Sequence, residues 1–409
     1  MLRRLRSAIS DDVIDLFASQ LIAVSASMLL TLFTASTLGA HGRGVFALVI
    51  GTANLIAQAV SFSLHVGAAN AYRSGDGGAI RHQLKVAALL ALAVLVVGVP
   101  ISLALPQGTT LGPVEGVLIC VLAAVLLIQS FATGTIQGVG LAAVYRRLVT
   151  INALLGLALG LISAFLTRSP TPVLLSWAAA SVVTSLAALP VLRRLSQDGG
   201  TTIPVRSVLT DSAAAHVGSL GQQLLFRADI PILGAFAPIR EVGLYSVASP
   251  VANVVFLLAQ TASMATFGVG REGNSLPAHE TRLRRILGIY LAVAIPTALL
   301  LMAGGAWLIP RLLPEFTQTP LLIALLVPGT VVQGVARIGL ASLFARSDQR
   351  SSMIVGIGSA LLSLAYFPAI IGAGAVGAAV ASSAIYCAQA ALVGLVLRRT
   401  RTPVVSADE

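Results

Sequence analysis

Residues 86–105 read VAALLALAVLVVGVPISLAL, a run of twenty residues without a single charge. A helix needs about 20 mostly apolar residues to cross the roughly 30 Å of hydrocarbon in a bilayer. The run therefore predicts a membrane-spanning helix.

The composition of the whole chain follows the same pattern. Of its 409 residues, 56% are hydrophobic and only 10% are charged, against about 25% charged residues in an average soluble domain. A soluble fold could not cover so much apolar surface with so few charges, so we expect lipid to be the solvent. The 26 basic residues come in short groups between apolar runs. This spacing is typical of helix ends and excludes a nucleic-acid-binding face.

Cutting the chain at charges, glycines and prolines predicts an all-α, polytopic membrane protein with twelve transmembrane helices. The expected spans are 14–38, 44–70, 85–105, 114–138, 148–167, 173–192, 212–236, 242–268, 286–309, 319–344, 352–371 and 376–397.

The basic residues also predict the orientation, because cytoplasmic loops carry an excess of Arg and Lys. Most of them fall in one alternating set of loops, and the other set holds only Arg43, Arg168, Arg240 and Arg311. We therefore expect a multi-pass protein of the cytoplasmic (inner) membrane with both termini in the cytoplasm. The loops on the outside are short, which leaves no room there for a catalytic domain.

The two halves of the chain resemble each other, and both end in Val-Leu-Arg-Arg, at 191–194 and 396–399. Six helices per half preserve the orientation of the repeat, so the halves would be related by an axis along the membrane normal. This predicts an N-terminal lobe (1–198, helices 1–6), a C-terminal lobe (199–409, helices 7–12) and a site between them.

Polar residues recur at helical spacing in three of the spans. On single helix faces lie His216, Gln223 and Arg227 in the seventh, Asn54, Gln58 and His65 in the second, and Asn253 and Gln260 in the eighth. Isolated amides usually bridge neighbouring helices. A charge at mid-membrane costs about 2.5–3.5 kcal/mol on insertion scales, so the stripe that ends in Arg227 favours a water-filled cavity.

An arginine at such a cavity suits an anion, because its planar guanidinium matches phosphate oxygens and stays charged. Arg337 is a second candidate, although snorkelling to the interface also explains it. Asp229 and Asp15 are candidates for ion coupling, and His216 and His65 for proton coupling. We find no P-loop, no HExxH and no Gly-x-Ser-x-Gly, so the sequence predicts no catalytic residue, metal site or cofactor.

A series of short motifs adds a family resemblance. They are LGAHGRGVFA (38–47), Arg227-Ala-Asp229, Gly234-Ala-Phe236, EVGLYSVA (241–248), LPEF (313–316) and LVPG (326–329). In this order they resemble the polysaccharide and O-antigen (Wzx-like) flippases of the multidrug/oligosaccharidyl-lipid/polysaccharide (MOP) exporter superfamily. The resemblance implies two six-helix lobes around a cavity lined by helices 1, 2, 7 and 8. It also implies a polyprenyl-diphosphate-linked glycan, moved from the inner to the outer leaflet by alternating access, with a polysaccharide polymerase and glycosyltransferases as partners.

Alternatives remain open at this point. A multidrug or small-molecule exporter of the same superfamily would need acidic residues in the cavity, where only Asp229 and Asp15 qualify. A major facilitator would carry a Gly-x-x-x-Asp-Arg-x-Gly-Arg loop, which residues 72–85 lack. A membrane glycosyltransferase or glycan ligase would need larger outside loops. Lipid II flippases carry further basic residues in helix 1 and two additional C-terminal helices, both missing here.

Overall fold

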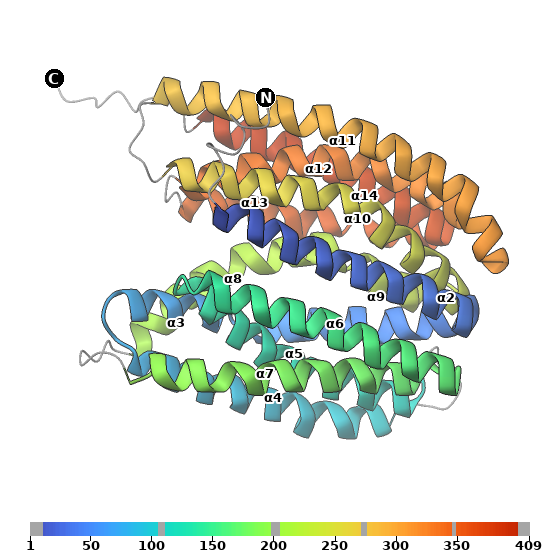
Figure 1. Cartoon of the computed structure of the whole chain (residues 1–409), viewed down its shortest axis with the longest axis horizontal. Helices are drawn as coiled ribbons and strands as arrows, with labels where there is room; N and C mark the ends of the chain where they lie inside the picture. Colours follow the sequence, from blue (N-terminus) through green and yellow to red (C-terminus); the bar gives the residue numbers. More distant parts are fainter. Residues whose placement is uncertain (1–10, 105–110, 198–204, 271–275, 346–348, 400–409) are drawn as a thin grey trace.

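The computed structural model describes residues 11–104, 111–197, 205–270, 276–345 and 349–399, which form helices and no strand. The first half holds α2 (Asp11–Val60), α3 (Leu64–Arg73), α4 (Gly78–Leu103), α5 (Pro113–Gly138), α6 (Ala142–Thr167) and α7 (Pro170–Leu195). The second half holds α8 (Val205–Arg227), α9 (Asp229–Phe236), α10 (Ile239–Gly270), α11 (Leu276–Leu312), η1 (Pro314–Phe316), α12 (Thr319–Ala345), α13 (Gln349–Ser363) and α14 (Tyr366–Arg399). The two halves form two bundles that meet along α2 and α10 (Figure 1).

The helices account for the twelve predicted crossings. Nine described helices are long and apolar enough to span a membrane. One of them, α2, turns back at Gly39 and crosses twice. Likewise α14 turns back at Ala373 and Gly374, and its short first arm completes the crossing that α13 begins. Together α8 and α9 supply one more crossing, broken at Ala228. The predicted twelve-helix fold is therefore confirmed.

A hydrogen bond demonstrates the turn-back in α2. Arg43 donates to the hydroxyl of Thr31 at 3.1 Å, across twelve positions of the chain. These residues would lie about 18 Å apart along a straight helix. The first and second arms of α2 must therefore run side by side.

The two turn-backs are built alike. Gly39 has φ 66° and Gly374 has φ 53°, in the left-handed region that glycine adopts at little cost. Each following helix begins with amides that lack an intrahelical acceptor. Carboxylates of glutamates accept from them: Ala40 N–H donates to Glu315 at 2.9 Å, and Ala375 N–H donates to Glu241 at 2.7 Å. Because Glu315 lies in η1 of the second half, the first turn-back is tied to the opposite bundle.

The bundles touch backbone to backbone near these turn-backs. A side chain on Gly243 of α10 would overlap the carbonyl oxygen of Ala40, and one on Gly44 would overlap the carbonyl oxygen of Ile239. The two helices can approach this closely only because both positions are glycine. This contact closes one end of the space between the bundles, which we call the turn-back end.

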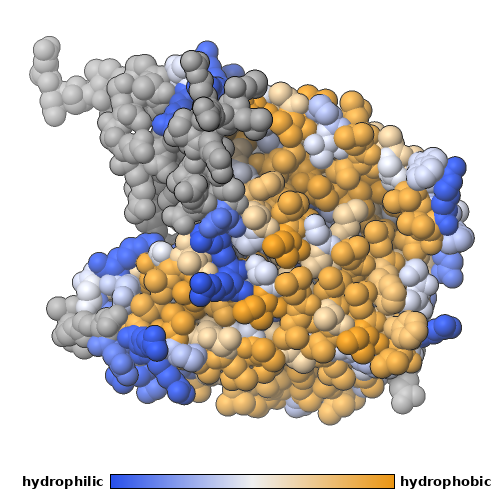
Figure 2. All heavy atoms as spheres, viewed as in Figure 1, coloured by the Kyte–Doolittle hydropathy of each residue, from blue (hydrophilic) through white to orange (hydrophobic). Residues whose placement is uncertain are grey.

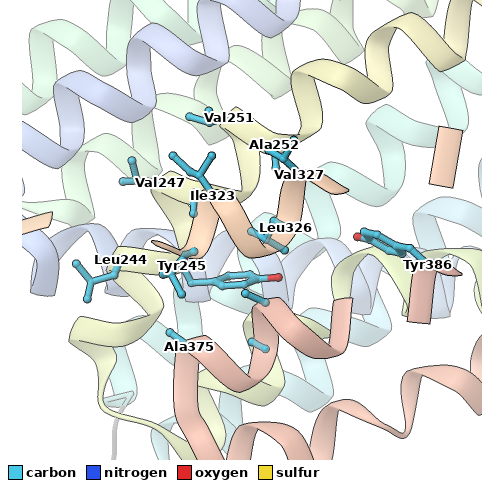
Figure 3. Packing of buried hydrophobic residues seen from close by; sticks show 14 of the residues in the cluster. Leu244, Tyr245, Val247, Val251, Ala252, Ile323, Leu326, Val327, Ala375 and Tyr386 are labelled. Atoms are coloured by element: carbon cyan, nitrogen blue, oxygen red, sulfur yellow. The ribbon is translucent and has the colours of Figure 1, made fainter. Parts of the chain in front are cut away.

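The outer surface and the core fit a lipid environment. A broad apolar band covers the middle of the visible face, and hydrophilic residues lie toward the two ends of the molecule (Figure 2). Large apolar side chains such as Leu89, Val96 and Leu300 are exposed on the surface of the protein. The largest buried cluster lies mainly in the second half, with a few residues of α2, and includes Tyr245, Leu326 and Tyr386 (Figure 3). The chain is thus a multi-pass membrane protein. The predicted lobe boundary at 198/199 lies outside the described residues.

Candidate functional site

A cavity of about 1030 Å³, with polar and charged side chains among its lining residues, lies between the two bundles. Its lining comes from α2, α5, α6 and α7 of the first half and from α8, α9, α10, α12 and α14 of the second. It reaches Tyr145 near the beginning of α6, Ala341 near the end of α12 and Val393 near the end of α14. The cavity therefore extends away from the turn-back end, toward the end of the bundle where α2 begins and α14 finishes.

The charges at the cavity are mostly positive. Among the described residues, the charged side chains in its lining are Arg43, Arg227, Arg337 and Asp229. Three guanidinium groups face one carboxylate, so the lining favours a ligand with negative charge.

Arg227 is the most accessible of these arginines. It is the last residue of α8, where the negative end of the helix dipole favours a cation. Its side chain is exposed, and no carboxylate of the described residues lies within salt-bridge distance of it. The guanidinium interacts electrostatically with Asp229 and Tyr386. Because neither Asp229 nor Tyr386 forms a salt bridge with it, the Arg227 guanidinium remains able to bind an anionic ligand.

Arg337 lies near the end of α12, four residues before Ala341, on the side of the cavity away from the turn-back end. Its guanidinium stacks over the ring of Phe256, 4.6 Å from the centroid, so it is held in place without a neutralising acid among the described residues. The arginine lies one helical turn beyond Gln333, whose side-chain oxygen is buried and has no hydrogen-bond partner.

Arg43 is placed differently from the expectation, which put it in an outside loop. The structure buries it in α2 with only 5% of its surface exposed, at the closed end of the cavity. Besides Thr31 it binds the hydroxyl of Thr34 at 3.1 Å and, across the bundle interface, the hydroxyl of Ser246 at 3.2 Å. The turn at Gly39 folds the arginine inward. The sequence carries a signal for this, since Arg43 lies between glycines in a quoted family motif.

The acid in the cavity belongs to a buried hydrogen-bond chain. Asp229 accepts from the Tyr245 hydroxyl at 2.6 Å and from the amide of Ile230 at 2.8 Å. The Tyr245 hydroxyl lies 3.0 Å from Ser382, which in turn lies 3.0 Å from the Tyr366 hydroxyl. This series of hydrogen bonds connects the helix break beside Arg227 to α14.

Six residues singled out from the sequence line the cavity together: Arg227, Gln223, Asn253, Gln260, Asp229 and Arg337. They come from four helices of the second half. The structure thus brings the polar faces of the seventh and eighth spans to one space.

The remaining candidates lie elsewhere. His216 bonds Ser63 at 3.3 Å and the carbonyl oxygen of Ala59 at 3.1 Å, in the packing between α8 and the end of α2. His65 packs against Gly134, and Asn54 donates to the carbonyl oxygen of Ile50 at 3.0 Å. Asp15 forms a salt bridge with Arg146 at 3.2 Å. Gln58 does not line the cavity. The stripe along the second span is interrupted because Phe62 and Ser63 have φ of 45° and 49°, which separates α2 from α3.

The architecture defines the class of protein. Twelve crossings in two similar bundles around a cavity that is closed at one end are the structure of a membrane transporter.

The chain belongs to the family described as polysaccharide biosynthesis protein, whose model matches residues 9–268. The match confirms the resemblance predicted from the motifs. No protein of curated function matches the sequence.

Solved transporters of the MOP superfamily share the fold. The lipid II flippase MurJ in an inward closed conformation gives a TM-score of 0.71 at 12% identity, over 96% of this chain and 88% of that chain. An inward-facing multidrug resistance MATE family transporter gives 0.62 at 15%, over 96% and 95%. A MOP superfamily transporter from Pyrococcus furiosus, for which a reversed polarity of the binding pocket suggests a different function, gives 0.58 at 15%, over 95% and 95%.

Proposed function

We propose that the chain is a flippase that moves a polyprenyl-diphosphate-linked oligosaccharide from the inner to the outer leaflet of the cytoplasmic membrane. The observation that carries the proposal is the set of three cavity arginines, none of which has a carboxylate within salt-bridge distance among the described residues. A diphosphate supplies the missing negative charge, and charge-assisted hydrogen bonds to guanidinium are among the strongest in proteins.

The binding geometry follows from where the arginines lie. Arg227 and Arg337 hold the diphosphate, the glycan fills the rest of the cavity, and the polyprenyl tail stays in lipid between the bundles. The contacts of Arg43 with Ser246 and of Ala40 with Glu315 cross the bundle interface at the turn-back end, so they must break when the opposite face opens. Rocking of the two bundles then exposes the head group on the other side.

Asp229 is our candidate for coupling to an ion gradient. The carboxylate is buried at the cavity, and its hydrogen-bond chain reaches α14 through Ser382. A change in its charge would therefore alter the packing between the cavity and a helix that lines it. In Asp229→Asn, transport should become insensitive to proton and sodium gradients while a basal rate persists. A gradient response as large as in the original chain would remove Asp229 from the mechanism.

The anion site is tested in proteoliposomes that contain a fluorescent polyprenyl-diphosphate oligosaccharide. Arg227→Ala should slow flipping by about tenfold or more, because a hydrogen bond to a charged group contributes about 1.5–3 kcal/mol. Arg311→Ala is the matched control, since Arg311 lies outside the cavity with its guanidinium over Trp307. Equal rates in the two variants would remove the anion site.

An exporter of cationic compounds is the second candidate, favoured by the buried Asp229 in the cavity. It predicts efflux of a cationic dye that depends on Asp229 and is indifferent to Arg227. The same vesicles, loaded with the dye, distinguish the two functions.

A further inference from the structure

The wall of the cavity formed by α5, α6 and α7, which we call the N-terminal wall, carries no charge. Its polar and aromatic lining residues are Gln129, Thr133, Tyr145, Asn152, Trp177 and Thr184. The proposed function gives roles to Arg227, Arg337 and Asp229, and it names no residue of this wall.

An aromatic surface is fixed on this wall. The indole of Trp177 stacks on the ring of Phe46, with centroids 6.4 Å apart and planes at 20°, and the guanidinium of Arg43 caps Phe46 at 4.9 Å. Gly156 of α6 lies against the indole, where a Cβ atom would be in ordinary contact with the ring at 3.4 Å. The indole N–H has no acceptor among the described residues. The ring is thus held rigidly at the cavity with an open donor.

An amide pair beside it keeps open hydrogen-bonding groups. Gln129 donates to the side-chain oxygen of Asn152 at 2.9 Å, and the hydroxyl of Thr184 approaches the same oxygen at 3.2 Å. In the described part of the chain, the amide nitrogen of Asn152 and the side-chain oxygen of Gln129 have no further partner. A polar group at membrane depth that is left unpaired costs about 1–3 kcal/mol, so a ligand or water must satisfy these groups.

We infer that this wall is a glycan subsite, in which Trp177 stacks on a neutral pyranose ring and Asn152 and Gln129 bind its hydroxyl or N-acetyl groups. A sugar presents donors and acceptors together with an apolar face of C–H groups, which matches neutral amides next to an indole. A second anion would find no positive partner among the cavity-lining residues of α5, α6 and α7. The inference rests on the proposed function, because the diphosphate on the arginines brings the sugar to this wall.

Trp177 itself reports on the subsite. The chain contains two tryptophans, and Trp307 is 61% exposed on the outer surface. Purified Trp307→Phe protein, which keeps Trp177 as its single tryptophan, is titrated with N-acetylglucosamine, galactose and rhamnose. Sorbitol serves as an open-chain polyol without a ring face. A pyranose should change the fluorescence saturably, and sorbitol should not.

Two variants in this background separate binding from folding. Asn152→Leu replaces the amide by an apolar side chain with the same number of heavy atoms and the same branching, and should weaken the sugar response about tenfold. Ser163→Ala breaks the Ser163–Ser176 contact between the same two helices away from the cavity, and should leave the response unchanged. Absence of any sugar response, or equal responses in the two variants, would overturn the subsite.

The subsite and the proposed function fail differently. If no sugar binds while flipping persists and depends on Arg227, the subsite is wrong and the flippase stands. If sugar binds through Asn152 while Arg227→Ala flips at the full rate, the anion site is wrong and the subsite stands.

Discussion

The two walls of the cavity come from similar halves of the chain and differ in chemistry. The N-terminal wall presents an indole and neutral amides, and the wall formed by the second half, here the C-terminal wall, presents Arg227, Arg337 and Asp229. The two halves therefore share a fold, whereas the charges on these two walls differ. A head group with one charged and one neutral end has a single favourable orientation between such walls.

The amide clusters of the two halves show the same contrast. In the second half, Gln389 bonds Gln222 at 2.9 Å and Ser359 at 2.8 Å, and only 1% of its surface is exposed. In the first half, Gln129 and Asn152 are half-buried and keep open groups. Gln389 also accepts from Gln333, so its side-chain groups are all bonded and it joins α8, α12, α13 and α14, whereas Gln129 and Asn152 keep groups available to a ligand. The following predictions test this division.

The largest effect is expected from reversing the charge on the C-terminal wall. Arg227→Glu should reduce flipping about a hundredfold or more, since it replaces an attraction to the diphosphate by a repulsion. Arg227→Lys keeps the charge, loses the planar fork and should retain part of the rate. Initial flipping rates in proteoliposomes check the order. A Glu variant as active as the Lys variant would contradict a charged wall.

The close contact at the turn-back end should give the next largest effect. Gly243→Ala forces α10 away from the carbonyl of Ala40, and such overpacking costs about 1–3 kcal/mol. Gly288→Ala on α11 meets nothing within 4 Å, and alanine is favoured over glycine in a helix by up to about 1 kcal/mol. Thermal unfolding in detergent should therefore shift in opposite directions. Equal shifts would show that the walls are not held together here.

The smallest effects compare the amide clusters themselves. Gln389→Leu leaves the side-chain oxygen of Gln222 and the side-chain nitrogen of Gln333 without their partner and should destabilise the fold by about 1–3 kcal/mol. Gln129→Leu leaves a group that water in the cavity reaches, so its effect on unfolding should be smaller, at about 1 kcal/mol or less. Comparing the unfolding midpoints of the two variants shows which substitution destabilises the fold more. A larger loss for Gln129→Leu would reverse the roles assigned to the two walls.

Most of the architecture could be predicted because it depends on apolar length and on the positions of Arg and Lys. The helix break within residues 44–70 could not be predicted, because it occurs at Phe62 and Ser63, which are not glycines and yet adopt left-handed backbone angles. A regular helix through that break would place His65 on the face of Asn54. Residue spacing predicts a shared helix face only where the helix is continuous.

The site was predictable where one helix carried the pattern and hidden where helices met. Arg227 and Gln223 follow from spacing along the seventh span. Arg43 was hidden because the turn at Gly39 folds a residue counted as a loop into the interior. The pairing of Gln129 with Asn152 joins two helices, and a single sequence has no periodicity that reveals it.

We propose that the cavity selects a negatively charged, lipid-linked glycan. The most direct measurement presents the purified protein in one set of vesicles with a polyprenyl-diphosphate oligosaccharide and a cationic dye together. We expect flipping of the glycolipid, inhibition of this flipping by added inorganic diphosphate and no transport of the dye. Dye transport without glycolipid flipping would contradict it.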